Sequence, residues 1–125
     1  MGKAIIIIAL LAQSIQVTAA FAQTAPAAFA DAAQKTLAEQ YCEKDGRFMQ
    51  CLGVDIKKDG AQCIKLMRSN WSFCRSTFLM TSPASIPPAD ARSYIDNLAT
   101  CARSGAIAAS GKPAGEVDAC MAGAR

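Results

Sequence analysis

The chain has 125 residues, 52% of them hydrophobic, and its 13 basic and 10 acidic side chains leave a formal net charge of +3. Charges of both signs are mixed along the sequence, without the basic runs typical of proteins that bind nucleic acid or anionic membranes. There is no histidine, so the commonest zinc ligand and the usual general base are both missing.

The first 22 residues have the three parts of a secretory signal peptide. Lys3 supplies a positive charge, residues 4–12 form an apolar run, and Ala20-Phe21-Ala22 has the A-x-A cleavage pattern. A membrane-spanning helix needs about 20 mostly apolar residues, and polar side chains from Gln13 onward interrupt this run. We therefore predict cleavage after Ala22 and export to the periplasm or the extracellular medium, with no stable membrane anchor.

Apolar residues at helical spacing predict an antiparallel helical hairpin in the first half of the mature chain. Its first arm covers residues 27–53. It consists of a helix over residues 27–44, which the stretch 44–46 can kink or end, and a further turn or two that Gly53 ends. Its second arm covers residues 59–80, with Asp59 as the capping residue and Gln62 as its capping-box partner.

The second half is predicted to hold another helix pair. The stretch 81–88 contains three prolines and cannot continue a helix. Residues 89–104 form an amphipathic helix that Gly105 is expected to stop, and Pro113 suits the first turn of a final short helix with Val117 facing inward. The predicted organisation after the signal peptide is one all-α domain of four or five helices, residues 23–125, made of a hairpin, a linker and a helix pair: 27–80, 81–88 and 89–123.

An even number of cysteines in a short exported chain predicts a disulfide framework. Metal-binding and redox pairs need closely spaced cysteines such as C-x-x-C, whereas the shortest gap here separates Cys42 from Cys51. We therefore expect no metal and no cofactor. All six cysteines fall in the mature chain: Cys42, Cys51, Cys63, Cys74, Cys101 and Cys120.

Helical geometry restricts how these cysteines can pair. On one helix, Cys63 and Cys74 lie about 16 Å apart at 1.5 Å per residue, whereas a disulfide requires Cα atoms within about 7 Å. Both must therefore bond to a neighbouring element. Folding the two arms of the hairpin together places Cys51 opposite Cys63 and Cys42 opposite Cys74. The predicted bridges are Cys42–Cys74, Cys51–Cys63 and, by elimination, Cys101–Cys120.

The spacings C-x8-C and C-x10-C across residues 42–74 resemble the twin C-x9-C helical hairpins of the mitochondrial intermembrane space, although neither spacing is identical to theirs. The resemblance covers this segment alone. It implies two antiparallel helices held together by disulfides.

Carboxylates are the remaining candidates for catalysis. Glu39 and Glu43 lie one helical turn apart, which could bring them together for acid–base work. Basic residues surround them, however: Lys35 and Arg47 lie four positions from Glu39 and Glu43 respectively. This pattern favours surface salt pairs, and we do not expect an enzyme.

Aromatic residues of the second arm are the candidates for a partner-binding surface. Trp71 and Phe73 point about 200° apart on a helix, so one of them faces away from the hairpin seam. Such a side chain either packs under another helix or contacts a partner. The candidate surface is Trp71, Phe73 and Phe78. We favour core packing over an exposed patch for the outward side chain, and whether Trp71 faces the core or a partner is left open.

These features predict a small exported helical protein that works by binding another envelope or extracellular protein, as an accessory, adaptor or inhibitor. The alternative is a secreted effector or membrane-active protein, which the helical, slightly cationic chain would suit. Neither nucleic acid nor a cofactor is an expected partner. The sequence leaves the oligomeric state open.

Overall fold

The computed structural model describes residues 25–123, and the predicted signal peptide, residues 1–22, lies outside this range. Every regular element within the described range is helical, and three disulfides join the helices, so the predicted all-α, disulfide-stapled class is confirmed. The elements in chain order are α2 (Pro26–Glu39), the π-helical turn η1 (Gln40–Lys44), α3 (Arg47–Cys51), α4 (Gly60–Arg68), α5 (Trp71–Thr81), the 3₁₀ turn η2 (Pro88–Asp90), α6 (Ala91–Ser110) and α7 (Ala114–Gly123).

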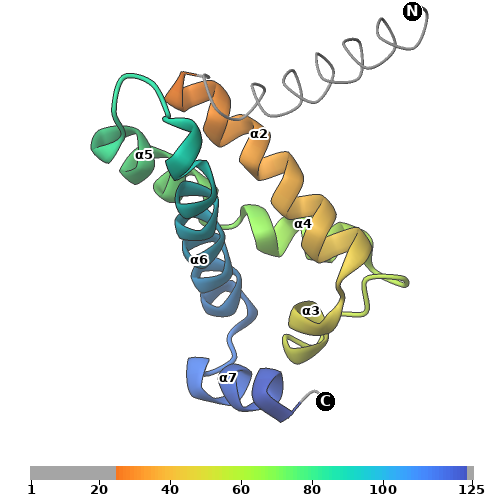
Figure 1. Ribbon diagram of the computed structural model, residues 1–125. Coiled ribbons are helices and arrows are strands. Elements are labelled where there is room, and N and C mark those ends of the chain that lie inside the picture. The colour runs from red at the N-terminus through yellow and green to blue at the C-terminus, as the bar shows by residue number, and fades with distance from the viewer. Residues whose placement is uncertain (1–24, 124–125) are drawn as a thin grey trace, which may run out of the picture.

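Helix α6 is the element around which the others are arranged. It packs against α2, α4, α5 and α7. Figure 1 shows α3 and α7 together at one end of the molecule, and the connection from α5 to α6 at the opposite end. At that second end α2, α5 and α6 meet through an aromatic cluster, in which the ring of Tyr94 packs edge-on against Phe29 and Phe78 at centroid distances of 6.4 and 5.7 Å.

The predicted antiparallel arrangement of the two arms is present. Contacts pair the start of the first arm with the end of the second, and the end of the first with the start of the second. They are the stacked rings of Phe29 and Phe78 at 5.7 Å, the salt bridge between Arg75 and Asp31 at 3.1 Å, and the disulfide between Cys42 and Cys63.

The register between the arms differs from the prediction, and the predicted bridges Cys42–Cys74 and Cys51–Cys63 are wrong. The first arm leaves the seam earlier than expected, because η1 ends at Lys44 and Asp45 has an extended backbone (φ −115°, ψ 98°). Helix α3 therefore lies outside the seam. Cys63 meets Cys42 instead, and Cys51 bonds to Cys120 of α7.

The second arm is two helices rather than one. Asp59 caps its start as predicted, since Asp59 Oδ1 accepts a hydrogen bond from the backbone N–H of Gln62 at 3.2 Å. The arm breaks after Arg68. There the hydroxyl of Ser69 donates to the carbonyl oxygens of Leu66 at 2.7 Å and Gly105 at 3.2 Å, which ties the break to α6.

Gly105 does not stop α6, contrary to the prediction, because it serves helix packing. A Cβ atom at this position would lie 2.3 Å from Cβ of Asn70, at the junction between α4 and α5. Only glycine allows the two backbones to approach this closely. The helix continues to Ser110 and ends at Gly111, whose φ of 76° is the left-handed conformation typical of a helix C-terminus.

The longer α6 also explains why the predicted Cys101–Cys120 bridge is wrong. Nine further helical residues follow Cys101, which carry the chain about 14 Å along the axis before α7 can begin. Cys101 instead lies beside α5 and bonds to Cys74, with a Cα–Cα distance of 5.8 Å. The proline-rich linker contributes to the core as well, since Ile86 within it is fully buried.

We predict that Gly105→Ala destabilises the protein although alanine is the better helix former. Helix propensity alone would favour alanine by about 1 kcal/mol, but the overlap with Asn70 forces a shift of packed backbone. Overpacking of this kind costs about 1–3 kcal/mol, so after the gain in helix propensity urea unfolding should show a net loss of up to about 2 kcal/mol.

The matched control is Gly115→Ala in α7, where an added Cβ meets no atom within 4 Å. This variant should leave the free energy of unfolding within about 0.5 kcal/mol of the wild type or raise it slightly. Equal effects of the two substitutions would show that close approach at Gly105 does not limit stability.

Candidate partner-binding surface

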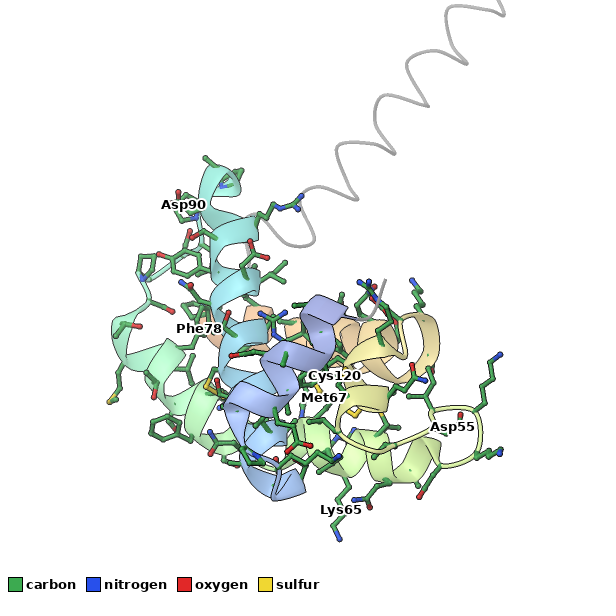
Figure 2. All side chains as sticks on the ribbon, turned by 90° about the horizontal axis from the view of Figure 1, so that it is seen from below. Asp55, Lys65, Met67, Phe78, Asp90 and Cys120 are labelled. Atoms are coloured by element: carbon green, nitrogen blue, oxygen red, sulfur yellow. A yellow bond between two sulfur atoms is a disulfide. The ribbon has the colours of Figure 1, made fainter. Side chains whose placement is uncertain are left out.

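Helix α5 has a buried face that includes two of the three predicted partner residues. Trp71 and Phe78 are each 7% exposed and belong to the core together with Cys74. Figure 2 shows Phe78 beside α6, between α5 and α6. These two side chains are therefore not available to a partner, and Trp71, whose role the sequence left open, is a core residue. Its indole Nε1 is buried without a hydrogen-bond partner.

The opposite face of α5 carries large apolar side chains in solvent. Phe73 is 63% exposed and Met80 is 79% exposed. They lie seven residues apart, which is about two helical turns, so they share one face. We define the outer face of α5 as Phe73, Ser76, Thr77 and Met80, all of which are exposed. Met80 was missed from the sequence, although its spacing from Phe73 places it on this face.

This outer face and the connection that follows it lack charge. Arg75 is the one charged residue within α5, and its guanidinium is held by Asp31 of α2 at 3.1 Å, away from the outer face. No charged residue occurs between Arg75 and Asp90 in the sequence. The outer face and this connection therefore present aromatic, thioether, hydroxyl and proline groups. Interfaces typically have such a charge-depleted centre.

A small cavity of about 240 Å³ adjoins the outer face, between α5 and α6. Thr77 and Thr81 line one wall, and Tyr94 and Asn97 line the other, with the Cys74–Cys101 disulfide also at its surface. Thr77 belongs to both the cavity and the outer face. A partner that covers Phe73 and Met80 could therefore place a side chain in a hollow whose walls are held together by a covalent bond.

Two larger hollows are built differently. A groove of about 820 Å³ between α2 and α6 has the apolar side chains of Leu37 and Ile95 in its lining, but Leu37 is buried and Ile95 half-buried. A hollow of about 680 Å³ next to α3 is lined by charged groups of both signs, including Arg47 and Asp55. Neither exposes a large apolar side chain as α5 does.

Within residues 25–123, no group of three or more cysteine, aspartate or glutamate side chains is placed to hold a metal ion. Arg47, which was expected to pair with Glu43, pairs with Asp45 at 3.5 Å instead. Both Glu39 and Glu43 border a shallow hollow beside Ile64.

Comparison of the chain with protein-family models, with curated proteins and with solved structures gives no match. No helix in the part of the chain that the structure describes is long and apolar enough to cross a membrane. Functional inference therefore depends on the geometry of the molecule itself.

Substitutions on the two faces of α5 should differ greatly in their effect on the free energy of unfolding. Phe78→Ala removes a ring from the aromatic cluster and should lower the free energy of unfolding by about 3–5 kcal/mol. Phe73→Ala removes a ring from solvent and should change it by less than about 0.5 kcal/mol. Urea titrations of the two variants measure this difference directly. A large loss from Phe73→Ala would mean that Phe73 is packed and that the outer face is wrongly assigned.

Proposed function

We propose that this chain is an exported, disulfide-stabilised helical protein that acts by binding another envelope or extracellular protein through the outer face of α5. The observation that carries the proposal is the pair of exposed side chains, Phe73 and Met80, on one uncharged helix face. Within the described residues these are the most exposed large apolar side chains, ahead of Ile64 at 38%.

The energetics support a binding role for this pair. Burying a phenylalanine or methionine side chain that was in water contributes about 1.5–3 kcal/mol. Two such side chains at the centre of an interface could supply hot spots, in which each truncation often costs 2 kcal/mol or more. Because Phe73 lies outside the core, its side chain does not stabilise the fold.

The disulfides support export. Three disulfides involve every cysteine in the described residues, and such bonds persist in oxidising compartments such as the periplasm and the extracellular medium. They also suit a binding protein, because the Cys74–Cys101 bond fixes α5 against α6 next to the proposed contact surface. A preformed surface loses less conformational entropy when it binds.

Position-specific photocrosslinking can identify the partner and locate its contact surface. A photoreactive amino acid at position 73 or 80 should capture the same protein from the native envelope or culture medium, whereas one at Lys58 should not. Lys58 is exposed and lies in the connection between α3 and α4. Capture at Lys58 but not at Phe73 or Met80 would place the interface elsewhere and overturn the assignment to α5.

With the captured protein purified, calorimetric titration tests whether the two side chains contribute to affinity. Phe73→Ala and Met80→Ala should each raise the dissociation constant about 10- to 100-fold. Ile64→Ala is the matched control, because Ile64 is also an exposed apolar residue but lies on α4 beside Glu39 and Glu43. It should leave the dissociation constant within about threefold of the wild-type value. Unchanged affinity in both α5 variants contradicts the proposal.

The membrane-active alternative makes a separate prediction. Vesicles of anionic phospholipid loaded with a fluorescent dye should remain intact in the presence of the oxidised mature protein. Leakage at low protein concentration that Phe73→Ala abolishes would mean that the outer face of α5 inserts into lipid and does not bind a protein.

A further inference from the structure

The three disulfides differ in how deeply they are buried. In Cys42–Cys63 both residues are buried, at 7% and 0% exposure. In Cys74–Cys101 the first residue is 2% exposed and the second is half-buried. In the third bond Cys51 is 6% exposed but Cys120 lies in the exposed class. Cys120 is therefore the most exposed of the six disulfide-bonded residues, and its bond is the first candidate for attack by a thiol in solution.

The helix that carries Cys120 is only lightly held by packing. Val117 is the single buried residue of α7, although the helix contacts α3 and α6. The connection from α6 consists of the short stretch Gly111–Pro113, with both of these end residues exposed. Figure 2, which views the molecule from below, shows α7 on the outside with Cys120 on the side toward α3.

The other two disulfides do not depend on α7. Cys42–Cys63 joins η1 to α4, and Cys74–Cys101 joins α5 to α6. These bonds close chain segments with sequence separations of 21 and 27 residues, whereas Cys51–Cys120 spans 69. Opening the third bond therefore leaves the other two bonds in place and removes the covalent link between α7 and α3.

We propose that Cys51–Cys120 is a thiol–disulfide exchange site for a dithiol reductant, and that its reduction releases α7 from α3 and α6. One thiolate of the reductant attacks Sγ of Cys120, forms a mixed disulfide and displaces Cys51 as a thiolate, which takes up a proton. The second thiol of the reductant, as a thiolate, then attacks the reductant's first sulfur, which is bonded to Sγ of Cys120. Cys120 leaves as a thiolate and takes up a proton. The reductant leaves as a disulfide, and the protein has gained two electrons and two protons as the thiols of Cys51 and Cys120.

Without the Cys51–Cys120 bond, α7 is held against α3 and α6 by packing alone. Helix α7 covers apolar surface on α3 and α6, and α3 carries the buried side chains of Phe48 and Met49. With the bond open, α7 is held by the buried Val117 and by the half-buried Met121, which packs against the core. Burial of an apolar side chain contributes about 1.5–3 kcal/mol, whereas ordering each residue of the chain costs about 1–2 kcal/mol. The packing of these two side chains is therefore weaker than the cost of ordering the ten residues of α7.

Stepwise reduction of the wild-type protein tests the exchange site. The oxidised protein is treated with dithiothreitol, trapped at intervals with an alkylating agent and mapped as non-reduced peptides. The Cys51–Cys120 peptide pair should disappear at least about tenfold faster than Cys42–Cys63 and Cys74–Cys101. Prior loss of either other bond, or simultaneous loss of all three, overturns the assignment.

Alkylation of Cys51 in the same samples tests the release of α7. If α7 leaves, the buried Cys51 becomes as accessible as Cys120, and both thiols should react with iodoacetamide at rates within about threefold of each other. If Cys120 reacts quickly while Cys51 stays protected, α7 remains docked after reduction, and the conformational part of the proposal is wrong.

A double variant gives an independent measurement. Cys51→Ser with Cys120→Ser should keep slow hydrogen exchange in α4 and α6 but raise exchange in α7 to nearly that of an unfolded peptide. The matched control, Cys42→Ser with Cys63→Ser, removes a buried bond and should speed exchange in α2 and α4 as well. Slow exchange in α7 of the first variant would contradict release. If that variant fails to fold, the reduction and alkylation of the wild-type protein still decide the question.

Discussion

The close contact between Gly105 and Asn70 is the constraint on which the rest of the arrangement depends. It joins the middle of α6 to the junction of α4 and α5, at a distance that no other residue than glycine allows. Ser69 strengthens the same contact through its hydrogen bond to the carbonyl oxygen of Gly105. With α6 fixed here, Cys101 lies within disulfide distance of Cys74, and Ala106 is fully buried one residue after the contact.

The disulfides follow from the helix positions and not from local chain geometry. None of the three bonds joins two cysteines of the same helix, since each joins two different elements. Each bond restricts the unfolded chain and contributes about 2–4 kcal/mol to stability. This contribution matters in a small domain whose aromatic content is low and in whose described core nine of the 21 buried residues are alanine or cysteine.

The helical class, the antiparallel arms and the cap at Asp59 could be predicted because each depends on periodicity or on a local hydrogen bond. Cys63 and Cys74 bond to other elements, as expected, although the single helix on which that expectation depended is broken after Arg68. The pairing itself could not be predicted, because it depends on where the first arm leaves the seam. That point is the extended residue Asp45, whereas the polar stretch after Gly53 gives the stronger turn signal in the sequence. Moving the turn shifts the register and changes every partner.

Gly105 shows a second limit of sequence reasoning. Glycine near the end of an amphipathic pattern usually marks a helix stop, and the same residue serves here as a point of close packing. The difference lies in the neighbouring helix and is not visible in α6 itself. For the candidate surface the sequence went further, since periodicity indicated that Trp71 and Phe73 cannot both face the hairpin seam. The phase of Cys74, which must face inward to form its bond, assigns Trp71 to the core and leaves Phe73 and Met80 outside.

The two ends of the molecule differ in how firmly their helices are held. At the end where α5 turns into α6, a buried aromatic cluster and the Cys74–Cys101 bond hold the helices together. An apolar surface exposed there stays in one conformation, which favours specific binding over non-specific association. At the opposite end, α7 depends on one bond with an exposed cysteine, on the buried Val117 and on the half-buried Met121. Local stability is therefore unevenly distributed. A change in α7 can occur while the outer face of α5 keeps its shape, because the Cys74–Cys101 bond and the contact between Gly105 and Asn70 hold α6 to α5 and to the α4–α5 junction independently of α7.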